Sequence, residues 1–296
     1  MDLTKAKIFL YAVDSGSLSK AATAFNYTPS GISHMMAAFE AEVGFSLLIR
    51  TKNGVIPTSN AERLLPIIRA QCSWDEQFCQ TVSEISGLAC GTLGIGAYSS
   101  IASQWLPKVI AAFHRDYPGI RFKLLEGVWQ EVDNYLLERK VEMGFYSYQP
   151  SSKHQWIPLK NDPMVVAVPL NHPLAAQSSV RIADIEKEQL IMPAYGSDID
   201  VVNLLKEENV KIEYQFSTLQ NYSAIGMVEE GLGVLITNAL ITRGRTNRIK
   251  LLPFDPPRSI NLGIAVPSEN RLTPAAIKFI DYCKEIIGAM DNELQQ

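Results

Sequence analysis

Residues 17–34 decide the fold of the N-terminal region, and they read Ser17-Leu-Ser-Lys-Ala-Ala-Thr-Ala-Phe-Asn-Tyr-Thr-Pro-Ser-Gly-Ile-Ser-His34. Apolar side chains at helical spacing predict one helix over 18–26 and a second over 30–43. Between them, Asn26 can adopt the left-handed backbone conformation that a tight corner needs. The small alanines of the first helix let the two helices cross closely. The stretch therefore predicts a helix-turn-helix.

The residues that follow predict a two-stranded hairpin over 47–58. Asn53-Gly54 is a strong signal for a hairpin turn, and the basic residues Arg50 and Lys52 lie beside it. Upstream, apolar residues predict an amphipathic helix over 3–14 that packs on the motif. Residues 1–58 are therefore expected to form one winged helix-turn-helix domain, all-α apart from its wing.

This stretch resembles the winged helix-turn-helix of LysR-type transcriptional regulators. The family pattern reads Gly-Ser-Phe/Leu-Ser-x-Ala-Ala, then Ser/Thr-Gln-x-x-x-Ser, then Leu-Phe-x-Arg and a wing. The matching residues here are Gly16-Ser17-Leu18-Ser19-Lys20-Ala21-Ala22, then Thr28 to Ser33, then Leu47-Leu48-Ile49-Arg50. The order of elements in the remaining chain is also similar to the family, with looser motifs.

The resemblance implies that this domain binds double-stranded promoter DNA. The start of the second motif helix would contact phosphates and base edges, with the basic wing beside it. The candidate DNA-binding residues are Ser17, Thr28, Pro29, Ser30, Ser33, His34, Arg50, Lys52 and Thr58. From the residues alone, the same helix face is also compatible with a capped and solvated surface.

Two positions depart from the family pattern. The family usually has Gln at the site of Pro29 and Arg at the site of His34. Proline cannot make the bidentate contact to adenine that Gln makes, so that base would be read through apolar contact or not at all. Histidine is largely neutral near pH 7, so a phosphate contact at this site would be weak or pH dependent.

Composition places the chain among packed globular proteins of two domains. It has 296 residues, 47% hydrophobic and 20% charged, with a net charge of −4. Residues 1–60 hold five Lys or Arg against four Asp or Glu. Charge alone therefore does not reveal DNA binding, and a DNA-binding protein with this balance must concentrate positive potential locally.

The sequence favours a cytoplasmic location. The N-terminus has no basic region followed by an apolar core, and no run of 18 apolar residues occurs. The four cysteines form no Cys-x-x-Cys pair and have no His at zinc-ligand spacing, which favours reduced structural thiols. Cys72 and Cys79 lie seven residues apart on one helix face, which leaves a redox role open.

Residues 59–86 predict one long helix, with Pro66 expected to kink it or to mark a break. Positions in steps of four and three form a plausible coiled-coil seam, of which five of seven are apolar: Leu64, Ile68, Gln71, Asp75, Phe78, Val82 and Ile85. The resemblance implies that this linker helix, within residues 59–90, pairs two subunits of a homodimer or homotetramer. Packing of the helix on its own domain is the alternative.

After a glycine hinge at Gly87–Gly91, strands and helices alternate, which predicts an α/β effector domain over 91–296 with a parallel sheet. We expect strands near 92–97, 120–125, 141–145, 164–169, 189–193, 211–216, 233–237 and 260–266. Helices are expected near 100–116, 130–139, 199–208, 221–231, 239–243 and 273–290. Subdomain I would cover about 91–162 and 267–296, and subdomain II about 163–266, with crossovers near 160–165 and 264–267.

A cleft between the two subdomains is the expected ligand site, because small ligands bind at the carboxyl ends of such strands. The resemblance implies the same, since LysR effector domains look like type 2 periplasmic binding proteins. Residues at strand ends give the candidate ligand-binding set: Ser99, Ser100, Ile101, Glu126, Gly127, Tyr146, Tyr195 and Thr218. Hydroxyls and helix amides at Ser99-Ser100 favour an anionic small molecule, although a plain N-cap is the alternative.

No catalytic, cofactor or metal motif stands out, so an enzyme is not expected. The glycines of Gly91-Thr-Leu-Gly-Ile-Gly96 enter a strand instead of following one, which argues against a dinucleotide loop. No Gly-x-Ser-x-Gly or His-Glu-x-x-His occurs. The expected function is a ligand-responsive transcriptional regulator. A cytoplasmic solute-binding or enzymatic α/β protein with an incidental helical N-terminal domain remains the alternative.

Overall fold

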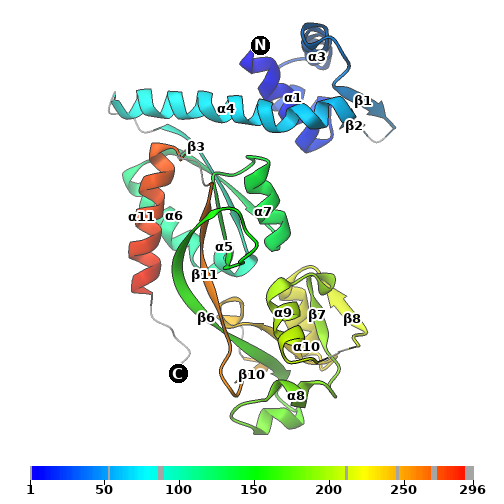
Figure 1. The fold of residues 1–296 in the computed structure, drawn as a ribbon, viewed down its shortest axis with the longest axis vertical. Coiled ribbons are helices and arrows are strands. Elements are labelled where there is room, and N and C mark those ends of the chain that lie inside the picture. The colour runs from blue at the N-terminus through cyan, green and yellow to red at the C-terminus, as the bar shows by residue number, and fades with distance from the viewer. Residues whose placement is uncertain are drawn as a thin grey trace. The chain divides into compact units, whose positions relative to one another are not determined.

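The computed structural model describes residues 2–52, 54–85, 90–210, 213–244, 247–267 and 272–290. The chain forms two compact units (Figure 1). One unit comprises Met1–Gly91 and Leu137–Lys140, and the other comprises Thr92–Leu136 and Val141–Gln296. The expected hinge at Gly87–Gly91 falls largely on residues 86–89, which lie outside the described residues.

The N-terminal unit contains the predicted helix-turn-helix and wing. Its elements are α1 (Leu3–Ser15), α2 (Leu18–Ala24), α3 (Pro29–Val43), β1 (Leu48–Thr51), β2 (Gly54–Pro57) and α4 (Ser59–Ile85). Asn26 has a φ of 57°, which confirms the left-handed corner between α2 and α3. Alanines of α2 and apolar residues of α1 and α3 form one buried core. The β1–β2 pair is antiparallel, so the wing is also confirmed.

A close backbone contact holds the wing against the turn between α1 and α2. The amide of Val55 donates a hydrogen bond of 2.9 Å to the carbonyl oxygen of Gly16. Gly54 has a φ of 133°, and a Cβ at this position would clash with that same oxygen. Glycine at the tip of the hairpin is therefore required by packing as well as by the turn.

The predicted seam residues of helix α4 do not form one continuous exposed apolar face. Leu64 and Ile68 pack into the core of their own unit, and Asp75 accepts a hydrogen bond of 2.7 Å from the Lys7 ammonium. Only Phe78 and Val82, among the predicted seam residues with described side chains, are largely exposed apolar groups. They continue a stripe whose exposed fractions are 57% for Ile67, 50% for Trp74, 68% for Phe78 and 45% for Val82.

Pro66 does not end α4. The helix runs through it for 27 residues, so the expected break is absent. A proline removes one backbone hydrogen bond, and the packing of the first half of α4 on the N-terminal core offsets that loss.

The C-terminal unit is built on a sheet of seven strands in the order β10-β6-β11-β5-β3-β4, with β9 paired to β6 (Figure 1). Its strands are β3 (Cys90–Ala97), β4 (Gly119–Glu126), β5 (Met143–Ser147), β6 (Gln155–Pro169), β9 (Leu235–Asn238), β10 (Ile249–Pro253) and β11 (Ser259–Val266). A separate parallel pair consists of β7 (Ile191–Pro193) and β8 (Phe216–Thr218).

Both α-helices and short 3₁₀ helices connect these strands. The α-helices are α5 (Ser99–Gln104), α6 (Leu106–Asp116), α7 (Trp129–Leu137), α8 (Ile182–Ile185), α9 (Ile199–Glu207), α10 (Asn221–Glu229) and α11 (Pro274–Ala289). Short 3₁₀ helices are η1 (Pro173–Ala176), η2 (Ala194–Gly196) and η3 (Ala239–Thr242). Residues 239–243 were expected to be an ordinary helix, and they form the 3₁₀ turn η3 instead.

The prediction of a parallel sheet is only partly right. Strands β3 and β5 are parallel, whereas β11 is antiparallel to β5 and to β6. The reason is that β6 and β11 are the two crossovers, and they run in opposite directions between the subdomains. The sequence showed only the apolar second half of β6, because its first half, residues 155–162, contains a proline and ends in the polar run Lys160-Asn161-Asp162.

The helix expected over 100–116 is two helices. Trp105 separates α5 from α6, and Pro107 stands in the first turn of α6. A proline here cannot donate to the carbonyl four residues earlier, and its ring disfavours a continuous helix. The break leaves the start of α5 at the end of β3, where the candidate ligand residues are.

Separate hydrophobic cores pack along different parts of the crossover strands. One contains β3, β5, α6 and α11, with Phe113 and Phe279 in contact within it. Another contains Val201, Leu204 and Leu205 of α9 and the apolar part of β6. Cys283 is buried in the first core, and burial raises the pKa of its thiol, as it does for Cys72. No helix in the described part of the chain is long and apolar enough to cross a membrane.

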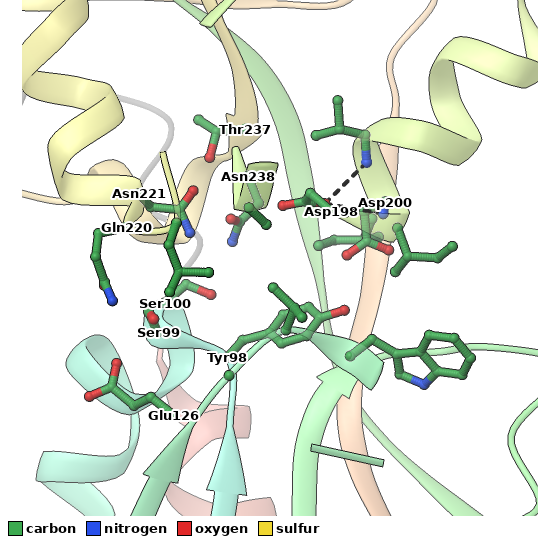
Figure 2. Close-up of a pocket in the computed structure, with 18 of the residues that line it drawn as sticks. Tyr98, Ser99, Ser100, Glu126, Asp198, Asp200, Gln220, Asn221, Thr237 and Asn238 are labelled. Atoms are coloured by element: carbon green, nitrogen blue, oxygen red, sulfur yellow. Dashed lines mark hydrogen bonds between the residues drawn. The ribbon is translucent and has the colours of Figure 1, made fainter. Parts of the chain in front are cut away.

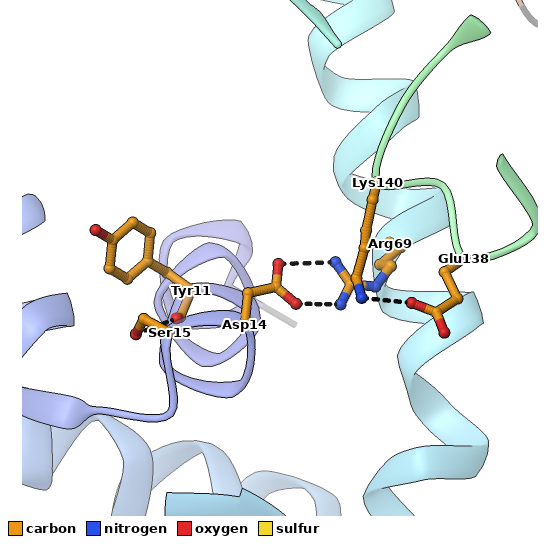
Figure 3. A network of polar contacts seen from close by, with 6 residues as sticks. All are labelled: Tyr11, Asp14, Ser15, Arg69, Glu138 and Lys140. Atoms are coloured by element: carbon orange, nitrogen blue, oxygen red, sulfur yellow. Dashed lines mark hydrogen bonds and ion pairs between the residues drawn. The ribbon is translucent and has the colours of Figure 1, made fainter. Parts of the chain in front are cut away.

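An ion pair between the buried Arg69 and the more exposed Asp14 joins α4 to α1 in the N-terminal unit (Figure 3). The Arg69 guanidinium donates from Nη1 to Asp14 Oδ2 at 3.1 Å and from Nη2 to Asp14 Oδ1 at 2.5 Å. Arg69 is only 7% exposed. The two-bond geometry fixes the angle of both side chains, and it orients α4 against α1.

We predict that Asp14→Ala destabilises the N-terminal unit by about 2 kcal/mol, because it leaves a buried guanidinium without its counter-charge. Hydrogen exchange of the α1 amides measures this, with protection expected to fall about 30-fold. The exposed pair Lys284–Asp281, 3.7 Å apart, is the control. Its loss in Lys284→Ala should cost under about 0.5 kcal/mol. Equal effects of the two substitutions would contradict the role given to burial.

Candidate functional site

The first turn of α3 forms an exposed polar surface. Thr28 caps the helix, and its Oγ1 accepts a hydrogen bond of 3.1 Å from the amide of Gly31. Pro29 occupies the first turn, where a missing N–H costs nothing. Ser30 and His34 are exposed beside it. The cap therefore aims the start of α3, with its free amides, at solvent.

The wing contributes a cation to the same surface. The Arg50 guanidinium donates from Nη2 to Ser33 Oγ at 3.4 Å, so the structure brings these two candidates together. Lys52 is exposed at the wing, and Asn53 lies outside the described residues. Phosphate oxygens are the natural partners of such a group of hydroxyls, helix amides and one arginine.

Two other DNA candidates have structural roles. Ser17 caps α2, and its Oγ accepts a hydrogen bond of 3.2 Å from the amide of Lys20. Thr58 Oγ1 donates to the carbonyl oxygen of Ser46 at 2.9 Å and accepts from the amide of Ala61 at 3.1 Å. Thr58 Oγ1 both donates and accepts within the domain, whereas Ser17 Oγ only accepts in its cap and can still donate its hydrogen to a phosphate oxygen.

The C-terminal unit contains a cavity of about 160 Å³ between its subdomains (Figure 2). This is close to the size of a cavity that holds one benzene ring, about 150 Å³. The wall includes the end of β3, the starts of α7, α9 and α10, and residues of β6 and β9. The cavity thus suits a molecule of about one ring.

Four predicted ligand residues line this cavity: Ser99, Ser100, Glu126 and Gly127. Four others do not belong to its described wall. Ile101 and Tyr146 are fully buried core residues, and the Tyr146 hydroxyl donates to Asp133 at 3.1 Å. Tyr195 has an exposed side chain, and Thr218 Oγ1 accepts from the amide of Gln220 at 3.4 Å. These four residues were predicted from their place at strand ends, but the direction of a side chain decides whether it reaches the cavity, and place in the chain does not give that direction.

The prominent residues that the sequence reasoning missed are Asp198 and Asp200. Asp198 caps α9, and its Oδ1 accepts from the amides of Asp200 at 3.1 Å and of Val201 at 3.2 Å. Asp200 Oδ1 accepts from Ser147 Oγ at 2.6 Å and from Gln149 Nε2 at 3.3 Å. An Asp-x-Asp at the start of an amphipathic helix was the signal that could have indicated them.

These contacts cross the cleft between the subdomains. Ser147 ends β5 of subdomain I, and its Oγ also lies 3.1 Å from the Tyr98 hydroxyl at the end of β3. Asp200 belongs to α9 of subdomain II. The group formed by Tyr98, Ser147, Gln149 and Asp200 therefore links the two walls on one side of the cavity.

Burial perturbs the acids of this group. Removal from water raises the pKa of Asp200 to about 7, and the nearby Asp198 carboxylate adds to this rise. Burial also raises the pKa of Asp198 and of Tyr98. On β6, burial raises the pKa of Asp162 to about 6, and this carboxyl accepts hydrogen bonds from Asn238 and from the amide of Leu240. Perturbed acids in a cavity are typical of functional sites.

A helix-turn-helix unit with an exposed capped helix, joined to a two-subdomain unit that encloses a small cavity, defines a ligand-binding transcription regulator. Family comparison agrees. Residues 3–62 match the family described as "Bacterial regulatory helix-turn-helix protein, lysR family", and residues 86–287 match "LysR substrate binding domain". The chain belongs to the LysR family of transcriptional regulators.

Individual relatives extend over almost the whole chain. An uncharacterised HTH-type transcriptional regulator of Bacillus subtilis, YvbU, is 30% identical over 98% of this chain and 100% of its own length. Full-length CbnR in complex with its target DNA is similar in fold, with a TM-score of 0.68, 17% identity, and coverage of 96% of this chain and 99% of that one. The effector-binding domain of QuiR with shikimate has a TM-score of 0.60 and 20% identity, covering 66% and 96%.

The family consists of regulators and not of enzymes, so the alternative of an enzymatic or solute-binding protein is set aside. Among the described residues, no group of three or more His, Cys, Asp or Glu side chains is placed to hold a metal ion. Because the family consists of regulators, catalysis does not explain the acidic side chains of the cavity.

We predict that Asp200→Asn stabilises the unliganded protein at about pH 8. The pKa of Asp200 is raised in the folded state, so folding favours its protonated form, and its cost to stability grows as pH rises from about 4 to about 7. The asparagine keeps an oxygen for Ser147 and loses the charge. The Tm of the variant should exceed that of wild type by about 3–6 °C at about pH 8.

Calorimetry across pH provides the check. The gap between the two Tm values should narrow toward about pH 4.5, where the wild-type carboxyl is protonated in the folded protein. Glu126→Gln is the matched control, since it also removes one carboxylate from the cavity wall. A pH-independent gap for Asp200→Asn would show that the gain comes from packing and not from the charge.

Proposed function

We propose that this regulator binds promoter DNA as a dimer through α3 and the wing, and that a small molecule in the cavity of the C-terminal unit changes that binding. Residues 1–58 would form the DNA-binding domain, 59–90 the linker and 91–296 the effector domain. The protein would act in the cytoplasm, where promoter DNA is accessible. The observation that carries the proposal is the presence, in one chain, of a capped, exposed α3 and a cavity lined by both polar and apolar side chains.

The hydrogen bonds across the cleft support a role for the cavity in switching. Asp200 accepts from Ser147 on the opposite wall, so a ligand that competes for either group changes the balance between open and closed subdomains. A ligand shifts such an equilibrium only by its difference in affinity for the two states. Among the solved structures of similar fold, one is a complex with target DNA and another is an effector-binding domain with shikimate. These fit a DNA-binding N-terminal unit and a ligand-binding C-terminal unit.

Arg50 and Ser33 should contact the DNA. We expect Arg50→Ala to weaken binding to all duplexes by a similar factor, because a phosphate contact carries no sequence information. The slope of log Kd against log salt should become shallower by about one unit. Ser33→Ala should weaken binding to a specific promoter site and have less effect on random duplex.

Fluorescence anisotropy at several salt concentrations measures these effects. Lys108→Ala is the matched control, since it removes an exposed cation on α6, outside the N-terminal unit. Its affinity and salt slope should equal those of wild type. Unchanged affinity in both Arg50→Ala and Ser33→Ala would remove these residues from the interface.

The exposed apolar stripe of α4 supports a dimer. Ile67, Trp74, Phe78 and Val82 recur at intervals of seven and four, which places them on one face of the helix. Such a face on a long helix is buried by a partner helix in coiled coils. The first half of the predicted seam is occupied by intramolecular packing, so the dimer contact would begin at Ile67 and extend toward the C-terminal end of α4.

We expect Phe78→Glu to produce monomers at micromolar concentration, because it places a charge in an apolar contact. Sedimentation velocity measures the change. Gln77→Glu adds the same charge about 100° around the helix, off the stripe, and should leave the wild-type assembly intact. A wild-type monomer in the same concentration range would contradict the proposed dimer, and a monomer of both variants would contradict the stripe as its location.

A further inference from the structure

The described wall of the cavity is rich in acids. Glu126, Glu131, Asp198 and Asp200 all line it, and none of the described lining residues is Lys, Arg or His. Figure 2 shows Asp198 and Asp200 together on one wall, and Glu126 beside Ser99 on another. A ligand whose only charge is negative would enter a field of its own sign.

Asp198 and Asp200 are the most constrained of these acids. Asp198 uses Oδ1 to cap α9, and Asp200 uses Oδ1 for Ser147 and Gln149. Two carboxylates brought close together and away from water repel each other, and their neutral hydrogen-bond donors cannot supply a counter-charge. A positive group between them would remove both the repulsion and the cost of burial.

We propose that the effector carries an ammonium group that binds against Asp198 and Asp200. This inference rests on the proposed role of the cavity as the effector site. It gives the chemical class of the ligand: a small primary amine with room for about one ring or an equivalent chain.

A second feature of the wall indicates what the rest of the ligand carries. Neutral polar groups line the side of the cavity opposite the two aspartates: the amides of Gln220 and Asn221 and the hydroxyls of Ser99 and Ser100. Amide N–H groups and hydroxyls donate hydrogen bonds, so oxygen atoms of the ligand are their natural partners. An amine at one end and oxygen atoms at the other, as in an amino acid, satisfies both features.

The test uses the full-length protein and matched pairs of probes. The probes are the standard L-amino acids and putrescine, each beside the compound that lacks the amine, such as phenylpropanoate for L-phenylalanine and butanediol for putrescine. At least one amine should raise the Tm by about 5 °C at about 100 times its Kd, and its partner should not. Amino acids and putrescine separate a ligand with an acceptor end from a simple diamine.

Two variants locate the ammonium group. Asp200→Asn should raise the Kd for the stabilising amine at least about tenfold, because the ammonium group loses its ionic partner and keeps only a hydrogen bond to a neutral amide oxygen. Asp281→Asn removes the same charge from an exposed position on α11 that does not line the cavity, and it should change the Kd by less than about threefold. Equal losses in the two variants would mean that the amine responds to the overall charge of the unit and would overturn the assigned position.

The change of ligand Kd with pH is an independent test, because it has opposite directions for an amine and for an anion. The titratable groups that face Asp200 are Asp198 beside it and Tyr98 from the end of β3, and Ser147 and Gln149 are neutral. The pKa of Asp200 is about 7, so its ionised fraction falls about tenfold between about pH 8 and about pH 6. Amines remain protonated there. The Kd for the amine should therefore rise about tenfold on acidification, whereas the Kd for an anion would fall.

The proposal is overturned if no amine raises the Tm more than the matched compound that lacks the amine. It is also overturned if carboxylates without an amine bind more tightly at the lower pH. Promoter binding by the unliganded protein, measured by anisotropy, is a separate readout. DNA binding that survives while every amine fails would remove the inferred ligand class and leave the proposed function standing. Loss of DNA binding altogether would remove the proposed function instead.

Discussion

The antiparallel register of β6 and β11 is the constraint on which the effector unit depends. Their pairing extends from Ser259↔Pro163 to Val266↔Gln155, and the far end of β6 then pairs with β9 and β10. One ladder of backbone hydrogen bonds therefore joins the two subdomains, and the cavity lies where side chains from both of them meet. Because a shift of register by one residue would turn every side chain to the other face, the same ladder fixes which residues line the cavity.

The polar wall of the cavity shows how ligand binding and stability oppose each other. Asp198 and Asp200 are held by a helix start and by hydroxyl and amide donors of the opposite wall. Their raised pKa values mean that burial disfavours their charged forms. Sites that bind a ligand tightly are commonly strained without it, since the groups that recognise the ligand cannot satisfy each other. The cross-cleft hydrogen bonds then connect the ligand to the relative position of the subdomains.

Helix α4 serves two structural purposes along its length. Its first half packs into the N-terminal core, and Arg69 ties it to α1 through Asp14. Farther along, its exposed apolar residues are available to a partner. A helix fixed at one end and paired at the other can set the separation of two recognition helices, which is the geometric variable that a dimeric DNA-binding protein must control. In this arrangement the N-terminal core provides the rigid reference for DNA contact.

The sequence by itself determined the local structure of this regulator: the Asn26 corner, the wing at Gly54, the caps at Ser17 and Thr28, and the alternation of strands and helices after residue 90. These depend on backbone conformation and periodicity, which a few neighbouring residues decide. Only the tertiary structure decided that β6 and β11 are antiparallel crossovers, that Ile68 is core and Ile67 is surface, and that Asp200 meets Ser147 across a cleft. Such contacts join residues about 50 or more positions apart, as with Ser147 and Asp200, and their side-chain directions follow from packing and not from local spacing.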